Sequence, residues 1–203
     1  MTDVGFPETL GVERALVIGT AAIGVCHLPT VVTLLRRHFE VDTAVCLTAS
    51  ARELVSAQAL AVLSERPVIA AGWDGQERPL HVDWAVWPEV VIVWPATMRF
   101  LARCAHGLTG DVPSSIVVGT EAPVFIAPSV AGGVVAGGPY RRAVELLRRD
   151  GRHIVDPIVG HGVSSWRLTD GACAPLDTVL RTVAQVMGAT EERVPAPVPG
   201  AGR

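Results

Sequence analysis

The stretch HVDWAVWPEVVIVWPATMRFLARCAHG, residues 81–107, decides the fold of this 203-residue chain. Its apolar run at 90–94 predicts a buried strand, and the Pro-Ala-Thr sequence at 95–97 predicts a tight turn into a helix. In an open α/β sheet, such a turn places backbone N–H groups and the positive end of a helix beside a ligand. His81 stands in a predicted short loop before the strand, from which it could reach the same cleft. We therefore expect the chemistry of the protein here.

The rest of the chain repeats this pattern of a strand followed by a helix. Apolar runs predict further strands at 15–18, 41–47, 68–71, 124–127 and 154–155. Helical periodicity predicts helices at 24–39 with a restart at Pro29, and at 51–63, 139–149 and 176–187. The alternation predicts an α/β fold, a single-domain Rossmann-like (flavodoxin-like) parallel sheet with helices on both faces.

One domain is expected, and it spans residues 14–188. Residues 1–13 are predicted to be an N-terminal extension, and the Pro- and Gly-rich residues 189–203 a disordered tail. The charged segment 72–79 predicts a flexible surface loop.

Composition narrows the class of protein. Hydrophobic residues make up 49% of the chain and its mean hydropathy is +0.39, which indicates a sheet buried on both faces or a surface covered by oligomerisation. No apolar run reaches the ~18 residues of a transmembrane helix, and the acidic N-terminus is unlike a secretory signal. We therefore expect a cytoplasmic protein without a membrane partner. The net charge of −3 argues against nucleic acid as a partner.

Missing residue types exclude some chemistries. All 17 basic residues are arginine, so neither Schiff-base chemistry nor a P-loop lysine is available within this chain. The chain also has no asparagine. Its widely spaced cysteines form no CxxC pair, so we expect buried thiols, without a metal site or disulfides; they are Cys26, Cys46, Cys104 and Cys173.

Small and hydroxyl residues follow three of the predicted strands. Small residues let backbone N–H groups approach an anion, and hydroxyl groups add further donors. Because the carboxyl ends of parallel strands meet at one edge of the sheet, these residues predict a site for a phosphate-bearing cofactor. The spacing is not GxGxxG, so a dinucleotide fingerprint is absent. The residues concerned are Gly19, Thr20 and Ala21, Thr48, Ala49 and Ser50, and Ala96 and Thr97.

In their order, these features resemble the FMN-dependent cysteine decarboxylases. That family includes phosphopantothenoylcysteine decarboxylase and the peptidyl-cysteine decarboxylases of epidermin-type lantibiotic pathways. ALVIGTAAIGVCHLPTVVTLLRRHF and LTASARELVSAQALAVLSERPV are similar to its first two strand ends and helices. PLHVDWA resembles the region of its catalytic histidine, and WPATMRFLARCAHGLTGD resembles its Pro-Ala-Ser-Ala-Asn-Thr motif. IAPSVAGGVVAGGPYRRAVELLRRDGRHIVDP resembles its substrate-clamp loop and the helix after it.

The resemblance, which covers about residues 14–157, implies a cofactor, a substrate and a reaction. FMN takes a hydride from the β-carbon of a cysteine at the C-terminus of a ribosomally made precursor peptide. The resulting thioaldehyde loses CO2, and an aminoenethiol leaves for aminovinyl-cysteine formation. His81 matches the family's catalytic base or proton shuttle. Relatives bind FMN between subunits, so a homo-oligomer, either a trimer or a dodecamer, is expected.

Two departures from the family pattern bear on the site. Thr97 and Met98 stand where the cofactor motif has Ser and Ala, and Arg99 replaces the family's asparagine. Arg99 is therefore a candidate catalytic residue that stabilises an enethiolate or holds a C-terminal carboxylate. The clamp loop lacks the family's Met, Asn and Trp residues, and its glycines favour a lid over a peptide. The implied substrate-binding residues are Ser129, Val130, Ala131, Gly132 and Gly133.

The altered clamp and the lost asparagine favour a peptide substrate over the pantothenate-linked one. Three alternatives stay open. They are phosphopantothenoylcysteine decarboxylase itself, a flavin prenyltransferase of the same fold, and a non-catalytic flavin-binding regulatory subunit. The prenyltransferase uses a lysine for its prenyl phosphate, and this chain has none.

Overall fold

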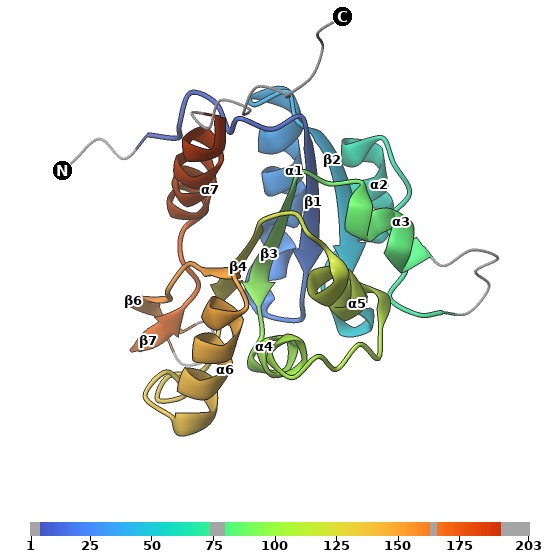
Figure 1. Ribbon diagram of the computed structural model, residues 1–203. Helices are drawn as coiled ribbons and strands as arrows, with labels where there is room; N and C mark the ends of the chain where they lie inside the picture. The colour runs from blue at the N-terminus through green and yellow to red at the C-terminus, as the bar shows by residue number, and fades with distance from the viewer. Residues whose placement is uncertain (1–4, 74–79, 163–165, 192–203) are drawn as a thin grey trace, which may run out of the picture.

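The computed structural model describes residues 5–73, 80–162 and 166–191. Five parallel strands form its main sheet in the order β2-β1-β3-β4-β5, which confirms the flavodoxin-like fold. Figure 1 labels the first four of them. Since β2 and β3 flank β1, the winding of the chain reverses at β1, and a crevice forms between the loops after β1 and β3. The strands are β1 (Arg14–Gly19), β2 (Asp42–Leu47), β3 (Val90–Ala96), β4 (Val124–Pro128) and β5 (His153–Ile154).

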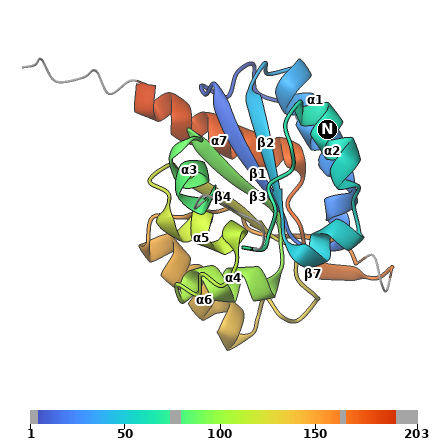
Figure 2. The same ribbon diagram turned by 90° about the vertical axis from the view of Figure 1, so that its right-hand side faces the viewer.

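Helices cover both faces of the sheet, as predicted (Figures 1 and 2). One face packs against α1 (Leu28–Arg37), α2 (Ala57–Ser64) and α7 (Leu176–Glu191). The other face packs against α3 (Leu80–Val86), α4 (Met98–Ala105), α5 (Val112–Gly119) and α6 (Gly138–Arg149). None of the helices among the described residues is long and apolar enough to cross a membrane.

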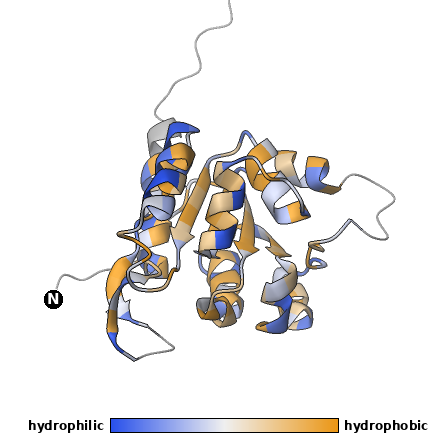
Figure 3. Ribbon diagram, turned by 90° about the horizontal axis from the view of Figure 1, so that it is seen from below, coloured by the Kyte–Doolittle hydropathy of each residue, from blue (hydrophilic) through white to orange (hydrophobic). Residues whose placement is uncertain are grey.

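The core forms because the strands are apolar on both faces. In β3, Val90, Ile92 and Trp94 enter the cluster under α1, and Val91 and Val93 enter the cluster under α4. In Figure 3 the strands of the main sheet are mostly apolar, and the helices around them carry both apolar and polar residues. Burial on both faces is typical of a parallel sheet.

Two predicted elements differ in detail from the structure. The predicted helix at 51–63 is divided into a 3-10 turn, η2 (Ala49–Glu53), and α2. Ser56 causes the division, because its side chain accepts a hydrogen bond from Ala59 N–H and starts a new helix. Leu54 then lies in the connection between the two, where it is exposed. The predicted strand at 68–71 is reduced to one bridge between Ile69 and Cys46.

The predicted restart of the first helix is confirmed. A 3-10 turn, η1 (Ile23–His27), precedes α1, whose first turn contains Pro29. Within the predicted N-terminal extension, Leu10 is fully buried in the core. Most of the predicted flexible loop, at 74–79, and most of the predicted disordered tail, from 192 onward, lie outside the described residues.

Two helices and a hairpin had no counterpart in the sequence prediction. The segment around His81 forms α3 instead of a loop. Residues 112–119 form α5, which the side chain of Asp111 caps by accepting a hydrogen bond from Ser114 N–H. An antiparallel hairpin of β6 (Ile158–His161) and β7 (Leu168–Ala172) follows the sheet.

Candidate functional site

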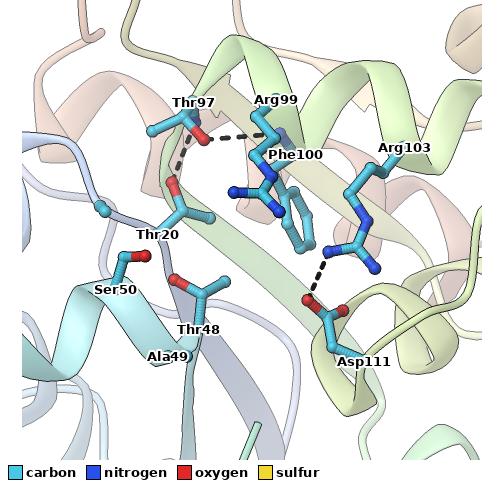
Figure 4. Close-up of a pocket in the computed structure, with 10 residues that line it drawn as sticks. Thr20, Thr48, Ala49, Ser50, Thr97, Arg99, Phe100, Arg103 and Asp111 are labelled. Atoms are coloured by element: carbon cyan, nitrogen blue, oxygen red, sulfur yellow. Dashed lines mark hydrogen bonds and ion pairs between the residues drawn. The ribbon is translucent and has the colours of Figure 1, made fainter.

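A small polar cavity, here called the rim pocket, lies at the carboxyl ends of β1, β2 and β3 (Figure 4). Its volume is about 120 Å³. Pockets that enclose whole small-molecule ligands hold roughly 300–1,000 Å³, so the rim pocket suits one small group such as a phosphate. It is lined by Thr20, Ala21, Thr48, Ala49, Ser50, Thr97, Arg99, Phe100, Arg103 and Asp111.

Thr20 joins the loops that follow β1 and β3. Its buried hydroxyl group donates a hydrogen bond to the Pro95 carbonyl at 2.8 Å and accepts one from Thr97 N–H at 2.9 Å. A hydroxyl group has one proton, so Thr20 cannot donate to a ligand while this network holds. Thr20 therefore positions the rim pocket.

Hydroxyl donors remain on the other two loops. Thr48 begins η2 without a side-chain cap, and within the described residues neither its hydroxyl group nor that of Ser50 has a hydrogen-bond partner. The Thr97 oxygen accepts a hydrogen bond from Phe100 N–H at 3.4 Å, which leaves its proton for a ligand. These three hydroxyl groups are the donors that an oxyanion needs.

Two arginines one turn apart on α4 add positive charge. Arg103 pairs with Asp111 at 2.7 Å, and the same carboxylate caps α5 through Ser114. Arg99 is exposed, and Figure 4 shows its guanidinium group pointing into the pocket. Its position on the first turn of α4 follows from Thr97, which caps that helix.

The structure brings most of the predicted cofactor-binding residues to the rim pocket. Thr20, Ala21, Thr48, Ser50 and Thr97 line it, together with Arg99. The prediction missed Phe100, Arg103 and Asp111, since the pairing of an arginine with a residue eight positions away gives no local sequence signal.

Three predicted cofactor-binding residues are not in the lining of the rim pocket. A Cβ atom on Gly19 would lie 2.5 Å from Leu28 Cδ1 and 2.8 Å from Leu47 Cδ2, so this glycine permits close packing under the loop. Ala96 is buried, and its carbonyl accepts a hydrogen bond from Ser129 N–H at 2.8 Å. Met98 packs at the edge of the core.

A second cavity, here called the hairpin cavity, lies beside the rim pocket. Its volume is about 640 Å³, within the range for a whole ligand. The β1–α1 loop borders both cavities, since Thr20 and Ala21 line the rim pocket and Ile23 and Gly24 line this one. The remaining lining consists of Ser129, Val130, Ala131, Gly132, His161, Gly162, Thr169, Gly171, Ala172 and Cys173.

Four of the five predicted substrate-binding residues, Ser129 to Gly132, line the hairpin cavity, and β7 holds them there. Val130 N–H donates to the Gly171 carbonyl at 2.9 Å, and the fifth residue, Gly133, donates to Asp170 at 3.3 Å. A Cβ atom on Gly171 would lie 2.3 Å from the Val130 carbonyl oxygen. The sequence prediction missed the hairpin side of this cavity.

Cys173 is the thiol of the hairpin cavity, and burial raises its pKa to about 12. The thiol therefore stays protonated at neutral pH and is a poor nucleophile. Within the described residues, no group of three or more His, Cys, Asp and Glu side chains is arranged to hold a metal ion.

His81 is in the lining of neither cavity. It occupies the first turn of α3, where its ring meets Trp73 edge-on at 4.9 Å, and its buried Nδ1 has no hydrogen-bond partner within the described residues. In both views α3 and the β6–β7 hairpin are on opposite sides of the molecule (Figures 1 and 2). A single chain therefore does not bring His81 to the hairpin cavity.

A family model completes this evidence: the flavoprotein model matches residues 6–188. The chain belongs to the flavoprotein family. The crystal structure of SpaF, described as an FMN-dependent cysteine decarboxylase, is 27% identical with a TM-score of 0.72, and the match covers 86% of this chain and 99% of SpaF. Membership in this family confirms the prediction of a flavoprotein. The description of SpaF as FMN-dependent supports FMN as the predicted cofactor.

Other relatives add fold and sequence likeness. The structure of the cypemycin decarboxylase CypD superposes with a TM-score of 0.74 at 21% identity, over 94% of this chain and 100% of CypD, and shows the shared fold. The coenzyme A biosynthesis bifunctional protein CoaBC of Haemophilus influenzae is 28% identical over 150 residues, which are 72% of this chain and 37% of CoaBC. The chain spans about a third of the length of the curated relatives it matches.

Proposed function

We propose that this flavoprotein is a decarboxylase that uses FMN to oxidise and decarboxylate the C-terminal cysteine of a ribosomally made precursor peptide, with an aminoenethiol as product. The observation that carries the proposal is the convergence of three strand-end loops on the rim pocket, at the point where the winding of the sheet reverses. A ligand-sized cavity beside that pocket supports the same proposal.

The residues of the rim pocket fit the phosphate of FMN. The hydroxyl groups of Thr48 and Ser50, the Thr97 hydroxyl proton and the first amides of α4 would hold it. When bound, FMN supplies the hydride acceptor for oxidation of the cysteine. Because the β1–α1 loop borders both cavities, one ligand with its phosphate in the rim pocket would extend toward the hairpin cavity.

The hairpin cavity would receive the end of the peptide. Gly132 and Gly171 let the segment that begins at Ser129 pack closely against β7, since a Cβ atom on either glycine would lie within 2.5 Å of a neighbouring atom, and this packing shapes the cavity. The 27% identity to SpaF along most of the chain supports a cysteine substrate. A peptide end suits this cavity because Ser129 and Thr169 offer hydroxyl groups beside a mostly small, apolar lining.

We further propose that His81 acts as base at the flavin of a second copy of the chain. Its helix is separated from the hairpin cavity of its own chain, and next to it Val82 and Val86 expose 49% and 79% of their surfaces. Such apolar exposure is suited to a contact between subunits. A homo-oligomer, predicted as a trimer or a dodecamer, would then complete each active site.

The experiment is an assay with purified, flavin-loaded protein and short peptides. Peptides that end in cysteine are compared with the same peptides ending in serine and with C-terminal amides. Mass spectrometry should detect loss of CO2 and two hydrogens from the free cysteine peptides alone. Flavin-loaded protein that leaves every such peptide unchanged would contradict the proposal.

A second candidate is decarboxylation of phosphopantothenoylcysteine. The 28% identity to CoaBC over 72% of this chain favours it. Turnover of this small thiol without turnover of any cysteine-terminated peptide would assign the chain to that reaction. The same mass-spectrometric assay distinguishes the two.

A further inference from the structure

Arg99 is the lining residue of the rim pocket whose role the other contacts in the pocket do not explain. The side chain reaches into the cavity from the first turn of α4 (Figure 4). Within the described residues, it has no hydrogen bond and no ion pair. An exposed arginine normally turns toward solvent or toward a carboxylate, so its direction here indicates what the pocket binds.

The charges of the pocket make Arg99 its uncompensated cation. Arg103 is neutralised by Asp111, at 2.7 Å. That carboxylate is itself fixed, because it accepts a hydrogen bond from Ser114 N–H at 3.0 Å. Among the described lining residues, Arg99 is therefore the one charge available to an anion.

The neutral donors of the pocket are fewer than its residue types suggest. The Thr20 hydroxyl group donates its hydrogen bond to the Pro95 carbonyl, and Thr97 N–H donates one to the Thr20 oxygen. Three hydroxyl protons and a few backbone amides are left for a phosphate that carries nearly two negative charges. The chain also has no lysine to supply a cation.

We propose that Arg99 binds the phosphate of the flavin and thereby makes the protein select FMN over riboflavin. This inference rests on the proposed use of the rim pocket by FMN. It gives Arg99 a role in cofactor binding, which differs from the catalytic role predicted from the sequence. The planar guanidinium group can donate two parallel hydrogen bonds to phosphate oxygens.

The test is a fluorescence titration of flavin-free protein with FMN and, separately, with riboflavin. Wild type is compared with Arg99→Ala, with Arg99→Lys, and with Arg149→Ala, which removes an exposed arginine of α6 outside the pocket lining. Arg99→Ala should weaken FMN binding about 10- to 100-fold, the expected loss for a hydrogen bond to a charged group, and leave riboflavin binding unchanged. Arg99→Lys should recover part of the preference, and Arg149→Ala should keep all of it.

An unchanged ratio of FMN to riboflavin affinity in Arg99→Ala would overturn the inference. This applies whether both affinities fall together or neither changes. A loss of turnover with normal FMN binding would instead assign Arg99 the catalytic role predicted from the sequence.

Thermal melting checks the fold of each variant. The salt dependence of the wild-type affinity ratio is a second measurement, because salt weakens the contribution of an exposed charge. Wild type that binds no flavin would remove the proposed function as well. Wild type that binds FMN and decarboxylates peptides, but whose variants keep the ratio, would remove this inference alone.

Discussion

The rim pocket and the surroundings of His81 differ in how completely one chain builds them. The rim pocket gathers residues from the ends of β1, β2 and β3, and the hydrogen bonds of Thr20 fix two of those loops to each other. His81 lies on α3, away from the hairpin cavity, with a buried Nδ1 that has no partner among the described residues. The difference teaches that one chain can build the proposed phosphate site, whereas the proposed proton transfer requires another copy.

The largest expected effect concerns His81. Removing a general base typically lowers a rate by about 10²–10⁴-fold, so His81→Asn should lower the rate of peptide decarboxylation by that factor. FMN should stay bound to the variant, as measured by its absorbance. His38→Asn, at the far end of α1 from the β1–α1 loop, is the matched control and should keep full activity.

Mixed oligomers show whether His81 acts in its own chain. Ser50→Glu places a carboxylate in the rim pocket and should prevent FMN binding by charge repulsion. Co-expressed Ser50→Glu and His81→Asn chains should regain decarboxylation, because one supplies the histidine and the other the flavin. Mixed oligomers that stay inactive would contradict the proposal that His81 acts at the flavin of another copy.

A second variant tests how firmly packing fixes the rim pocket. Gly19→Ala forces a methyl group against Leu28, Leu47 and Val25, all within 2.9 Å of the new Cβ. We expect a loss of about 1–3 kcal/mol in the free energy of unfolding, measured by denaturant titration, together with weaker FMN binding. Gly119→Ala, where no atom lies within 4 Å, is the control and should not destabilise the fold. A fully stable Gly19→Ala would show that the loop adapts.

A third variant separates the hairpin cavity from the rim pocket. Gly171→Ala brings a methyl group within 2.3 Å of the Val130 carbonyl oxygen and should displace β7 from the segment that begins at Ser129. We expect the KM for the peptide to rise several-fold, since small displacements of binding groups lower catalytic efficiency, while FMN affinity is unchanged. Equal losses in both quantities would show that the two cavities act as one.

The smallest expected effect lies at the opposite end of the sheet. A hydrogen bond from Arg66 lowers the pKa of Asp42, at the start of β2. A lowered pKa in the folded state stabilises the protein above the usual Asp value of about 3.9, and this contribution disappears as the pH falls through the folded pKa. Arg66→Met should therefore cost about 0–1 kcal/mol at neutral pH, with the difference from wild type vanishing in acid.

This pair also serves as a control for the comparison of the two regions. FMN affinity and peptide turnover of Arg66→Met should match those of wild type, because Asp42 lies at the amino end of the strands. Urea unfolding across the acidic range measures the stability, and a difference that grows toward low pH would contradict the assignment.

Local patterns account for what could be predicted from the sequence. The apolar runs of β1, β2 and β3 and the small residues after them place the rim pocket, since parallel strands bring their carboxyl ends together whatever the intervening helices do. Thr97 was found because it follows a strand, and Arg99 because it departs from a family motif. These residues lie close to an element whose type is easily predicted.

Long-range relations account for what could not. The cap of α5 by Asp111 and the pairing of that residue with Arg103 depend on where two segments meet in space. The hairpin has an exposed and irregular pattern, with Val159 and Leu168 largely exposed, so its strands lack the alternation that predicts β-structure. The helix around His81 is short and has no fully buried residue, which leaves its apolar periodicity weak.

A crystal structure of the complex with FMN tests the central claim most directly, namely that the rim pocket holds the flavin phosphate. The account predicts phosphate oxygens within hydrogen-bond distance of the Thr48 and Ser50 hydroxyl groups and of the first turn of α4. A phosphate bound elsewhere, with those hydroxyl groups facing only water, would contradict it.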